Sequence, residues 1–352
     1  VQTCANKSPQ YITPQNPYGF HDGARRLDLA EGVARYCEWL IDDMRKARCQ
    51  GVLFWGQGGQ NPRGAMYRPD FDILPPEVEA QWPTLVERFG EAGLRVGVCA
   101  RPGEVAYRRD WTRDATLRLD PDDPAHVAMM WRRFKTMIDK GCTAFYCDTF
   151  GASLDDVKLM RAYRERMGPE VETYVEHACD AVLPYSGLYT EIRYNNKADR
   201  YGLAWMSPHT WEVFRWLVPG VQCVVKSRVN LKELPEGHER PFPWLFRHRM
   251  TPLVDDWLLT RHVDELRALT GEYLDEEGQW KKQAGLADGD DSPDRHRGGA
   301  CDHAAARRHL DRAAQLERRH REPPDRPGGG LSRQGAAAPK RRAPIDVGPS
   351  AL

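Results

Sequence analysis

The chain has 352 residues, with 51 basic and 51 acidic side chains and a formal net charge of zero. This length suits one large domain, or one domain followed by a tail. The balanced charge gives no sign of a nucleic-acid partner, and no run of residues approaches the roughly 18 apolar residues of a membrane span.

Short apolar segments and one-sided helices alternate along residues 1–282. The helices carry apolar residues at spacings near 3.6, which is typical of helices that cover one face of a sheet. Helices are predicted over Glu31–Arg48 and Pro76–Ala92, after Asp123-Pro124, after Ser153, and after Ser207-Pro208.

Six apolar segments of strand length lie between and after these helices. Near-continuous hydrophobic runs are typical of parallel strands that are covered on both faces. We expect a first strand near residues 11–20 or upstream of Val1, and a last strand after Pro252 or lost with the tail. The six segments are Gly51–Gly56, Leu94–Ala100, Thr143–Asp148, Val171–His177, Leu188–Arg193 and Val221–Lys226.

This alternation predicts an α/β protein with a (β/α)₈ TIM-type barrel over residues 1–282. An open doubly wound sheet is the alternative, but no glycine-rich phosphate motif follows any strand. Residues 283–352 are dominated by Arg, Ala, Gly, Pro, Asp and His, and the last aromatic residue is Trp280. We predict a disordered, low-complexity tail there. The alternative is a shifted reading of a GC-rich gene, in which case the barrel is incomplete.

Three successive strands end in the pattern aromatic-x-acid. Residues two apart share one face of a strand, and the apolar opposite face is expected to meet the helices. The acids then line the inner rim at the carboxyl ends of the strands, where barrels of this kind have their active sites. The pairs are Tyr146 with Asp148, Tyr174 with Glu176, and Tyr189 with Glu191.

These carboxylates suit the cleavage of a glycosidic bond. Neighbouring strands are about 4.8 Å apart, so Asp148 and Glu176 can approach the roughly 5–5.5 Å separation of a retaining pair. One of two such close carboxylates holds its proton while the other stays charged. We predict Asp148 as the nucleophile or stabilising carboxylate and Glu176 as the acid/base, with Glu191 as the competing acid/base.

Loops rich in amide, arginine and aromatic side chains follow two of the strands and suit a sugar ligand. Basic residues at other strand ends complete the predicted site. No zinc-ligand spacing and no three-cysteine cluster is present, so neither a metal nor a cofactor is predicted. The predicted substrate-binding residues are Trp55, Gln57, Arg101, Trp111, Tyr146, Tyr174, Arg193 and Lys226.

The segment Gly141–Gly151 (GCTAFYCDTFG) resembles the fourth strand of barrels related to α-galactosidases and α-glucosidases. The preceding Gly93–Pro102 (GLRVGVCARP) is similar to their third strand. This resemblance implies a TIM-barrel glycosidase in which Asp148 is the nucleophile. Two departures stand out, because Tyr146 replaces the usual Lys and the later acid is Glu rather than Asp. They indicate a distinct branch of this group.

Other interpretations remain open at this stage. The barrel is either active or a carbohydrate-binding protein without catalysis, and a third possibility is a lyase or aldolase in which Lys226 forms a Schiff base. The acids themselves have structural alternatives, namely helix caps and ion pairs. We interpret the acidic pairs Asp42-Asp43, Asp155-Asp156 and Asp255-Asp256 as solvated helix faces or caps.

The nine cysteines are scattered, odd in number and include no C-x-x-C pair. This usage favours a reducing compartment over a disulfide framework, so we expect a cytoplasmic protein. A carbohydrate is the expected partner, with neither nucleic acid nor membrane. The sequence specifies no sugar, linkage or oligomeric state.

Overall fold

The computed structural model describes residues 2–4, 29–55, 71–74, 76–106, 116–204, 206–276 and 278–281. Two predicted substrate-binding residues, Gln57 and Trp111, lie outside these ranges, as does the tail predicted over residues 283–352.

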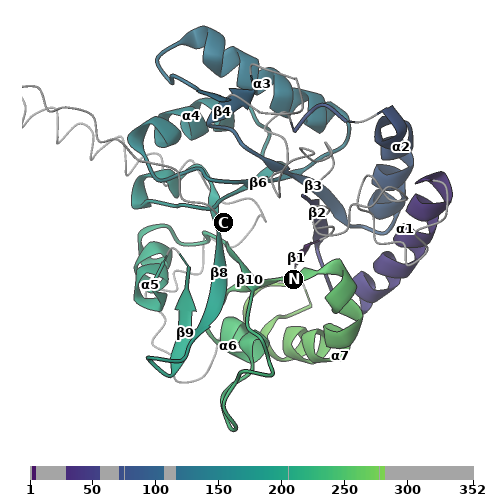
Figure 1. The fold of residues 1–352 in the computed structure, drawn as a ribbon, viewed down its shortest axis with the longest axis vertical. Coiled ribbons are helices and arrows are strands. Elements are labelled where there is room, and N and C mark those ends of the chain that lie inside the picture. Colours follow the sequence, from purple (N-terminus) through teal and green to yellow (C-terminus); the bar gives the residue numbers. More distant parts are fainter. Residues whose placement is uncertain are drawn as a thin grey trace, which may run out of the picture. The chain divides into compact units, whose positions relative to one another are not determined.

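Eight parallel strands of the described residues form a closed ring (Figure 1). Each strand pairs with the next along the chain, and β8 with β10 and β11 with β1 complete the circle. The predicted TIM-type barrel is therefore confirmed. The strands are β1 (Gln2–Cys4), β2 (Gly51–Phe54), β3 (Arg95–Ala100), β6 (Ala144–Cys147), β7 (Glu172–Val175), β8 (Gly187–Asn195), β10 (Cys223–Ser227) and β11 (Thr251–Asp255).

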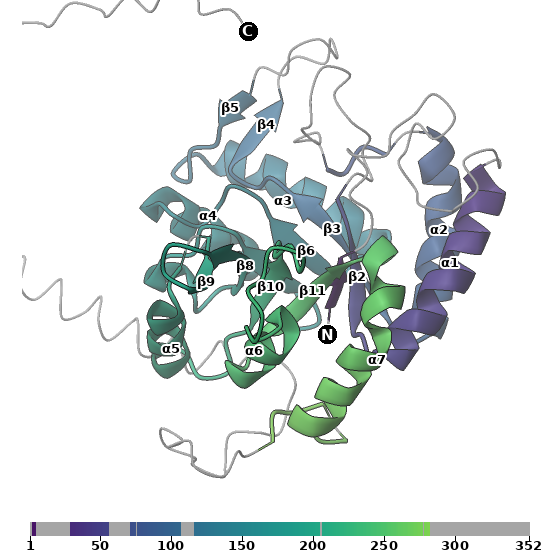
Figure 2. The same cartoon turned by 60° about the horizontal axis from the view of Figure 1, so that its bottom comes forward.

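Helices surround the ring of strands, and α1 packs against both α2 and α7 (Figure 2). The helices predicted around 31–48 and 76–92 are confirmed to within two residues at each end. Side chains cap three of the predicted starts, because Asp123, Ser153 and Ser207 each accept a hydrogen bond from a backbone N–H of the first turn. The helices are α1 (Leu29–Lys46), α2 (Pro76–Glu91), α3 (Pro124–Asp139), α4 (Leu154–Arg164), α5 (Pro208–Leu217), α6 (Pro241–Arg247) and α7 (Asp256–Tyr273).

The first and last strands of the barrel differ from those that we predicted. The first strand is Gln2–Cys4, neither near residues 11–20 nor upstream of Val1. The last strand contains Pro252 rather than following it. Proline has no N–H to donate to a strand ladder, so sequence patterns place strands away from it. The antiparallel β9 (Arg200–Leu203), the β4–β5 hairpin (Glu104–Ala106 and Thr116–Arg118), α6 and α7 were not predicted.

Two apolar layers result from the alternation of side chains along the strands. The larger layer lies between strands and helices, and a smaller one fills the inside of the ring. Gly97 makes room there, because a Cβ at this position would lie 2.8 Å from Ala144 Cβ and 2.5 Å from Leu53 Cδ2. The interior residues are Leu53, Trp55, Cys99, Ala144, Tyr146, Tyr174, Tyr189, Val224 and Leu253.

Burial in the outer apolar layer predicts that replacing two helix tryptophans will have unequal effects on the free energy of unfolding. Trp82 is 2% exposed, packs against Phe54 and donates its indole N–H to the carbonyl of Lys140. We expect Trp82→Ala to lower the free energy of unfolding by about 3–5 kcal/mol. Trp216 is 75% exposed, and Trp216→Ala is expected to change it by less than about 0.5 kcal/mol. Urea unfolding measures both, and equal losses would contradict this packing.

Candidate active site

Three aromatic rings form a floor inside the barrel beneath the predicted acids. The Tyr146 and Tyr189 rings are 4.2 Å apart between centroids, and Trp55 lies 4.9 Å from Tyr146. Tyr146 donates its hydroxyl to Asp148 Oδ1 at 3.1 Å, and Tyr189 donates to Glu191 at 3.2 Å. The structure therefore brings Asp148 and Glu191 together with their aromatic partners on the inner face of the ring.

The third pair, Tyr174 with Glu176, is arranged differently. The Tyr174 ring lies inside the barrel, but its hydroxyl donates to Glu172 at the start of the same strand and lies 3.5 Å from Gln222. Glu172 pairs in turn with Arg95 at the start of β3. The hydroxyl of Tyr174 is thus held at the amino-terminal end of the barrel, away from the other predicted site residues.

Asp148 follows β6 and is 9% exposed. Arg101 Nε lies 3.6 Å from Asp148 Oδ2, close enough for an ion pair but too far for a hydrogen bond. The same guanidinium pairs with Glu104 and donates to Thr149 Oγ1 at 3.4 Å. Arg101 therefore lies between two carboxylates.

Glu176 follows β7 and is held by the backbone of the neighbouring strand end. The Thr149 N–H donates to Glu176 Oε2 at 2.9 Å, and His177 Nε2 is 3.3 Å from the same oxygen. Burial lowers the pKa of His177, although the nearby Asp148 and Asp156 carboxylates oppose this shift. His177 is therefore neutral near neutral pH, and Glu176 has no arginine or lysine partner among the residues that the structure describes.

Thr149 adopts a backbone conformation that a β-branched residue rarely takes, with φ of 49°. Such strain persists only where the surroundings hold it in place. Asp156 supplies that support, because its Oδ2 accepts the N–H groups of Gly151 and Ser153 at 3.2 Å each. Arg118 on β5 pairs with the other Asp156 oxygen. The loop between β6 and α4 is thereby fixed with the Thr149 N–H aimed at Glu176.

Glu191 is enclosed by cations. Arg193 Nη2 lies 3.0 Å from one carboxylate oxygen and Arg228 Nη2 lies 2.6 Å from the other. Burial raises the pKa of Glu191, but the charges and hydrogen bonds of Arg228 and Arg193 outweigh it and leave the pKa below its usual value of 4.5. Glu191 is therefore ionised at neutral pH.

Lys226 on β10 is 2% exposed and forms an ion pair with Asp255 at the end of β11, with Nζ 2.5 Å from Oδ1. Its ammonium also lies 5.7 Å from the centroid of the Trp55 ring, within the range of a cation–π interaction. The cation is thus held at the rim between a carboxylate and the aromatic floor.

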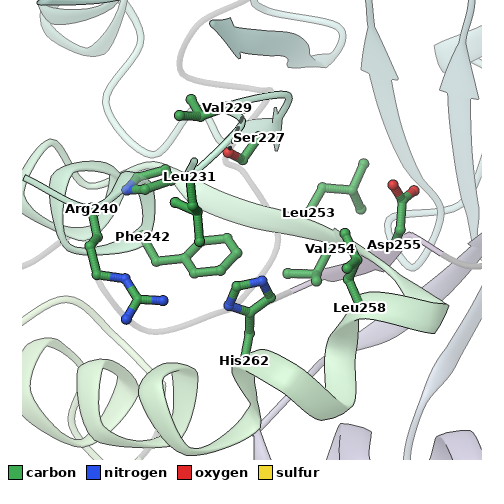
Figure 3. Close-up of a pocket in the computed structure, with 11 residues that line it drawn as sticks. Ser227, Val229, Leu231, Arg240, Phe242, Leu253, Val254, Asp255, Leu258 and His262 are labelled. Atoms are coloured by element: carbon green, nitrogen blue, oxygen red, sulfur yellow. Dashed lines mark hydrogen bonds between the residues drawn. The ribbon is translucent and has the colours of Figure 1, made fainter. Parts of the chain in front are cut away.

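A separate pocket opens between the ends of β10 and β11 and the helices α6 and α7 (Figure 3). Phe242 and His262 face each other there, with ring centroids 4.8 Å apart. Asp255 contributes to the pocket and to the rim, whereas the three predicted catalytic acids do not line it. The lining residues are Ser227, Val229, Leu231, Arg240, Pro241, Phe242, Leu253, Val254, Asp255, Leu258 and His262.

The interpretation of the three acidic pairs as solvated faces or caps is partly wrong. Asp43 is 7% exposed and accepts the hydroxyl of Thr260. Asp156 is 2% exposed and Asp256 is fully buried, where it accepts the hydroxyl of Tyr36 at 3.2 Å. Asp255 occupies the cap position of α7, but its side chain makes no cap hydrogen bond and turns to Lys226 instead. Local sequence shows an acid at a helix start and does not show a partner far along the chain.

The sequence patterns did not identify four residues that contribute to the rim. Asp255 ends an apolar strand just as Asp148 does, and Arg228 lies two residues beyond Lys226, so both carried a usable signal. Thr149 and His177 carried none, because their roles depend on a backbone angle and on a contact across strands. Within the described ranges, no group of three or more His, Cys, Asp or Glu side chains is arranged to hold a metal ion.

Among the seven cysteines whose side-chain burial the structure describes, six are buried and Cys179 is partly exposed. Burial raises the pKa of Cys37 to about 11 and that of Cys49 to about 12. These two thiols are therefore protonated at neutral pH and unsuited to nucleophilic attack. None of the helices that the structure describes has the length and apolar character needed to cross a membrane.

The fold and rim place this chain among parallel α/β barrels with carboxylates at the carboxyl ends of the strands. The solved structures to which this chain is similar include α-galactosidases and α-amylases. The galactosidase domain of an α-galactosidase-sucrose kinase is 11% identical, with a TM-score of 0.46, over 78% of this chain and 40% of that one. An α-galactosidase from Lactobacillus brevis is 9% identical, with a TM-score of 0.47 and the same coverages.

An α-amylase from Lactobacillus plantarum is 11% identical, with a TM-score of 0.48, over 72% of this chain and 70% of that one. This chain spans less than half the length of the two matched α-galactosidase chains. No family model and no curated protein matches the sequence. These solved structures are what the chain is similar to, and the barrel itself rests on the pairing of its own strands.

The ion pairs of Glu191 with Arg193 and Arg228 predict that the free energy of unfolding depends on pH. The pKa of Glu191 is lowered in the folded protein, so its ion pairs contribute stability above the usual value of 4.5, and this is lost as the pH falls through the folded pKa. Wild type and Glu191→Gln should therefore differ most in free energy of unfolding at neutral pH, and the difference should shrink in acid. Urea unfolding across this range measures it.

Glu236→Gln is the matched control, because Glu236 is exposed and its replacement should change the free energy of unfolding by less than about 0.5 kcal/mol. If the free energies of unfolding of wild type and Glu191→Gln differ by the same amount at every pH, the stabilising role of the Glu191 ion pairs is contradicted.

Proposed function

We propose that this protein is a glycoside hydrolase in which Asp148 and Glu176 are the reacting carboxylates. One hydrogen bond carries this proposal. The peptide N–H that joins Asp148 to Thr149 donates to the Glu176 carboxylate at 2.9 Å. A single peptide unit thus couples the ends of the adjacent parallel strands β6 and β7, and both acids belong to the rim where barrels of this kind bind substrate.

Asp148 is suited to the charged role. Arg101 and the Tyr146 hydroxyl both favour its carboxylate form. A carboxylate at this place either attacks the anomeric carbon or stabilises the positive charge that develops on the sugar ring. Trp55 and Tyr146 pack together beneath it and are buried, so they support the carboxylate from inside the barrel.

Glu176 is the better candidate for the acid/base. A general acid must carry a proton when the glycosidic oxygen leaves. The lowered pKa of Glu191 keeps that residue ionised, which is unfavourable for this role. Glu176 has no arginine partner among the described residues and lies beside a neutral His177. These contrasts favour Glu176 over Glu191.

The alternative of a Schiff-base lyase gains little support. Lys226 does lie at a strand end, but its amine is bound to Asp255 and is 2% exposed. The carboxylate stabilises the ammonium form, which has no lone pair with which to attack a carbonyl. The remaining alternative is a barrel that binds carbohydrate without cleaving it, and this predicts that loss of the Asp148 charge has no kinetic effect.

Asp148→Asn tests that difference. We expect turnover of a panel of aryl α- and β-glycosides to fall by at least about 10³-fold, which corresponds to about 4 kcal/mol of transition-state stabilisation. Asp155→Asn is the matched control, because Asp155 is exposed on α4 and should leave the rate unchanged. If no glycoside is cleaved, or if Asp148→Asn retains the wild-type rate, the hydrolase proposal is wrong.

Substrates with different leaving groups distinguish Glu176 from Glu191 as the acid/base. A phenol with a low pKa departs without protonation, so loss of a general acid matters little for it. Glu176→Gln should therefore lose about 10²–10⁴-fold in kcat/KM on glycosides with poor leaving groups and much less on activated ones. Glu191→Gln should lose similar factors on both kinds of substrate. The reverse pattern would assign the acid/base to Glu191.

A further inference from the structure

The two arginines that hold Glu191 carry more charge than it can neutralise. Arg193 extends along β8 beyond Glu191, and Arg228 follows β10. Each uses an Nη2 group to bind a different Glu191 oxygen. A guanidinium has five N–H donors, so most donors of both side chains are not used by Glu191. The two side chains remain 62% and 45% exposed.

Among the described residues, Asp255 is a further acid that acts on Arg228. Asp255 is paired with Lys226, and the two form a neutral pair, so the excess positive charge of the arginines remains. The Arg193–Glu191–Arg228 cluster therefore keeps one net positive charge at the rim over β8 and β10. Glu191 also fixes the direction of both guanidiniums, so that an incoming anion meets groups already in place.

The part of the rim over β3 and β6 carries the opposite sign. Arg101 lies there between Asp148 and Glu104, and this cluster of three side chains keeps one net negative charge. The negative side suits the cationic character of a sugar ring as its glycosidic bond breaks. A ligand at the rim would thus lie with its reacting carbon near β6 and β7 and any anionic substituent near the adjoining strands β8 and β10.

We propose that Arg193 and Arg228 form a subsite for an anionic group on a sugar, either the carboxylate of a uronic acid or a sulfate ester. Guanidiniums match the planar oxygens of a carboxylate and the oxygens of a sulfate through paired hydrogen bonds. This proposal deepens the proposed function by naming its substrate class, and it rests on that function only for the cleavage step. Glu191 then acts as a positioning residue for the two arginines.

Binding of small glycosides to the full-length protein tests the subsite without turnover. The probes are methyl glucuronosides and galacturonosides, the 6-sulfates of methyl glucoside and galactoside, and the neutral parent glycosides, each in both anomers. Isothermal titration should show at least one anionic probe binding about 10- to 100-fold more tightly than its neutral parent. This preference should weaken as salt is added. The uronosides and sulfates distinguish the two anions.

Arg193→Gln and Arg228→Gln, singly and together, should remove the preference for the anionic probe over its neutral parent. Arg247→Gln is the matched control. Arg247 lies on α6, outside the rim, where it is 59% exposed and pairs with Glu239. Equal binding of anionic and neutral probes to the wild type overturns the subsite, as does a preference that survives both substitutions. If the double variant unfolds, the wild-type comparison alone decides.

The outcomes for the subsite and for the hydrolase are distinct. Binding of an anionic probe that depends on Arg193 and Arg228, without cleavage of any aryl uronoside or sulfated glycoside, retains the subsite and rejects the hydrolase. Cleavage of neutral glycosides with no preference for an anion retains the hydrolase and rejects the subsite.

Discussion

Every side chain inside a closed ring of parallel strands must fit among its neighbours and satisfy its polar atoms there. The rest of the site depends on this constraint. Tyr146 and Tyr189 fill the ring and have hydroxyls that need partners, and the acids two residues further along each strand provide them. The aromatic floor and the acidic rim are therefore one hydrogen-bonded unit, and replacing a tyrosine would affect the carboxylate above it.

Electrostatics explains why the rim is a mixture of acids and bases. A buried charge without a partner is far more costly than a pair, and the structure pairs Asp148 with Arg101, Glu191 with two arginines, and Lys226 with Asp255. The pairing is uneven around the ring. Glu176 is held by a backbone N–H and a neutral histidine, whereas Glu191 has two cations, and this imbalance separates the roles proposed for two similar glutamates.

Backbone geometry contributes as much as charge. Thr149 holds a left-handed conformation, and the buried Asp156 binds two N–H groups of the same loop while Arg118 of the β4–β5 hairpin binds Asp156. An acid that local sequence assigns to a helix cap thus also supports the loop that positions Glu176.

The sequence alone determined the barrel, the capped helix starts, and the inward direction of Asp148 and Glu191, because these follow from periodicities of 3.6 and 2 along contiguous residues. It placed the first and last strands wrongly, since β1 has only three residues and β11 contains a proline. Only the tertiary structure turned the Tyr174 hydroxyl to the far end of the barrel, joined Asp255 to Lys226, and brought Arg228 to Glu191. These contacts join different strands or depend on side-chain direction, and no local pattern specifies which partner a buried polar group finds.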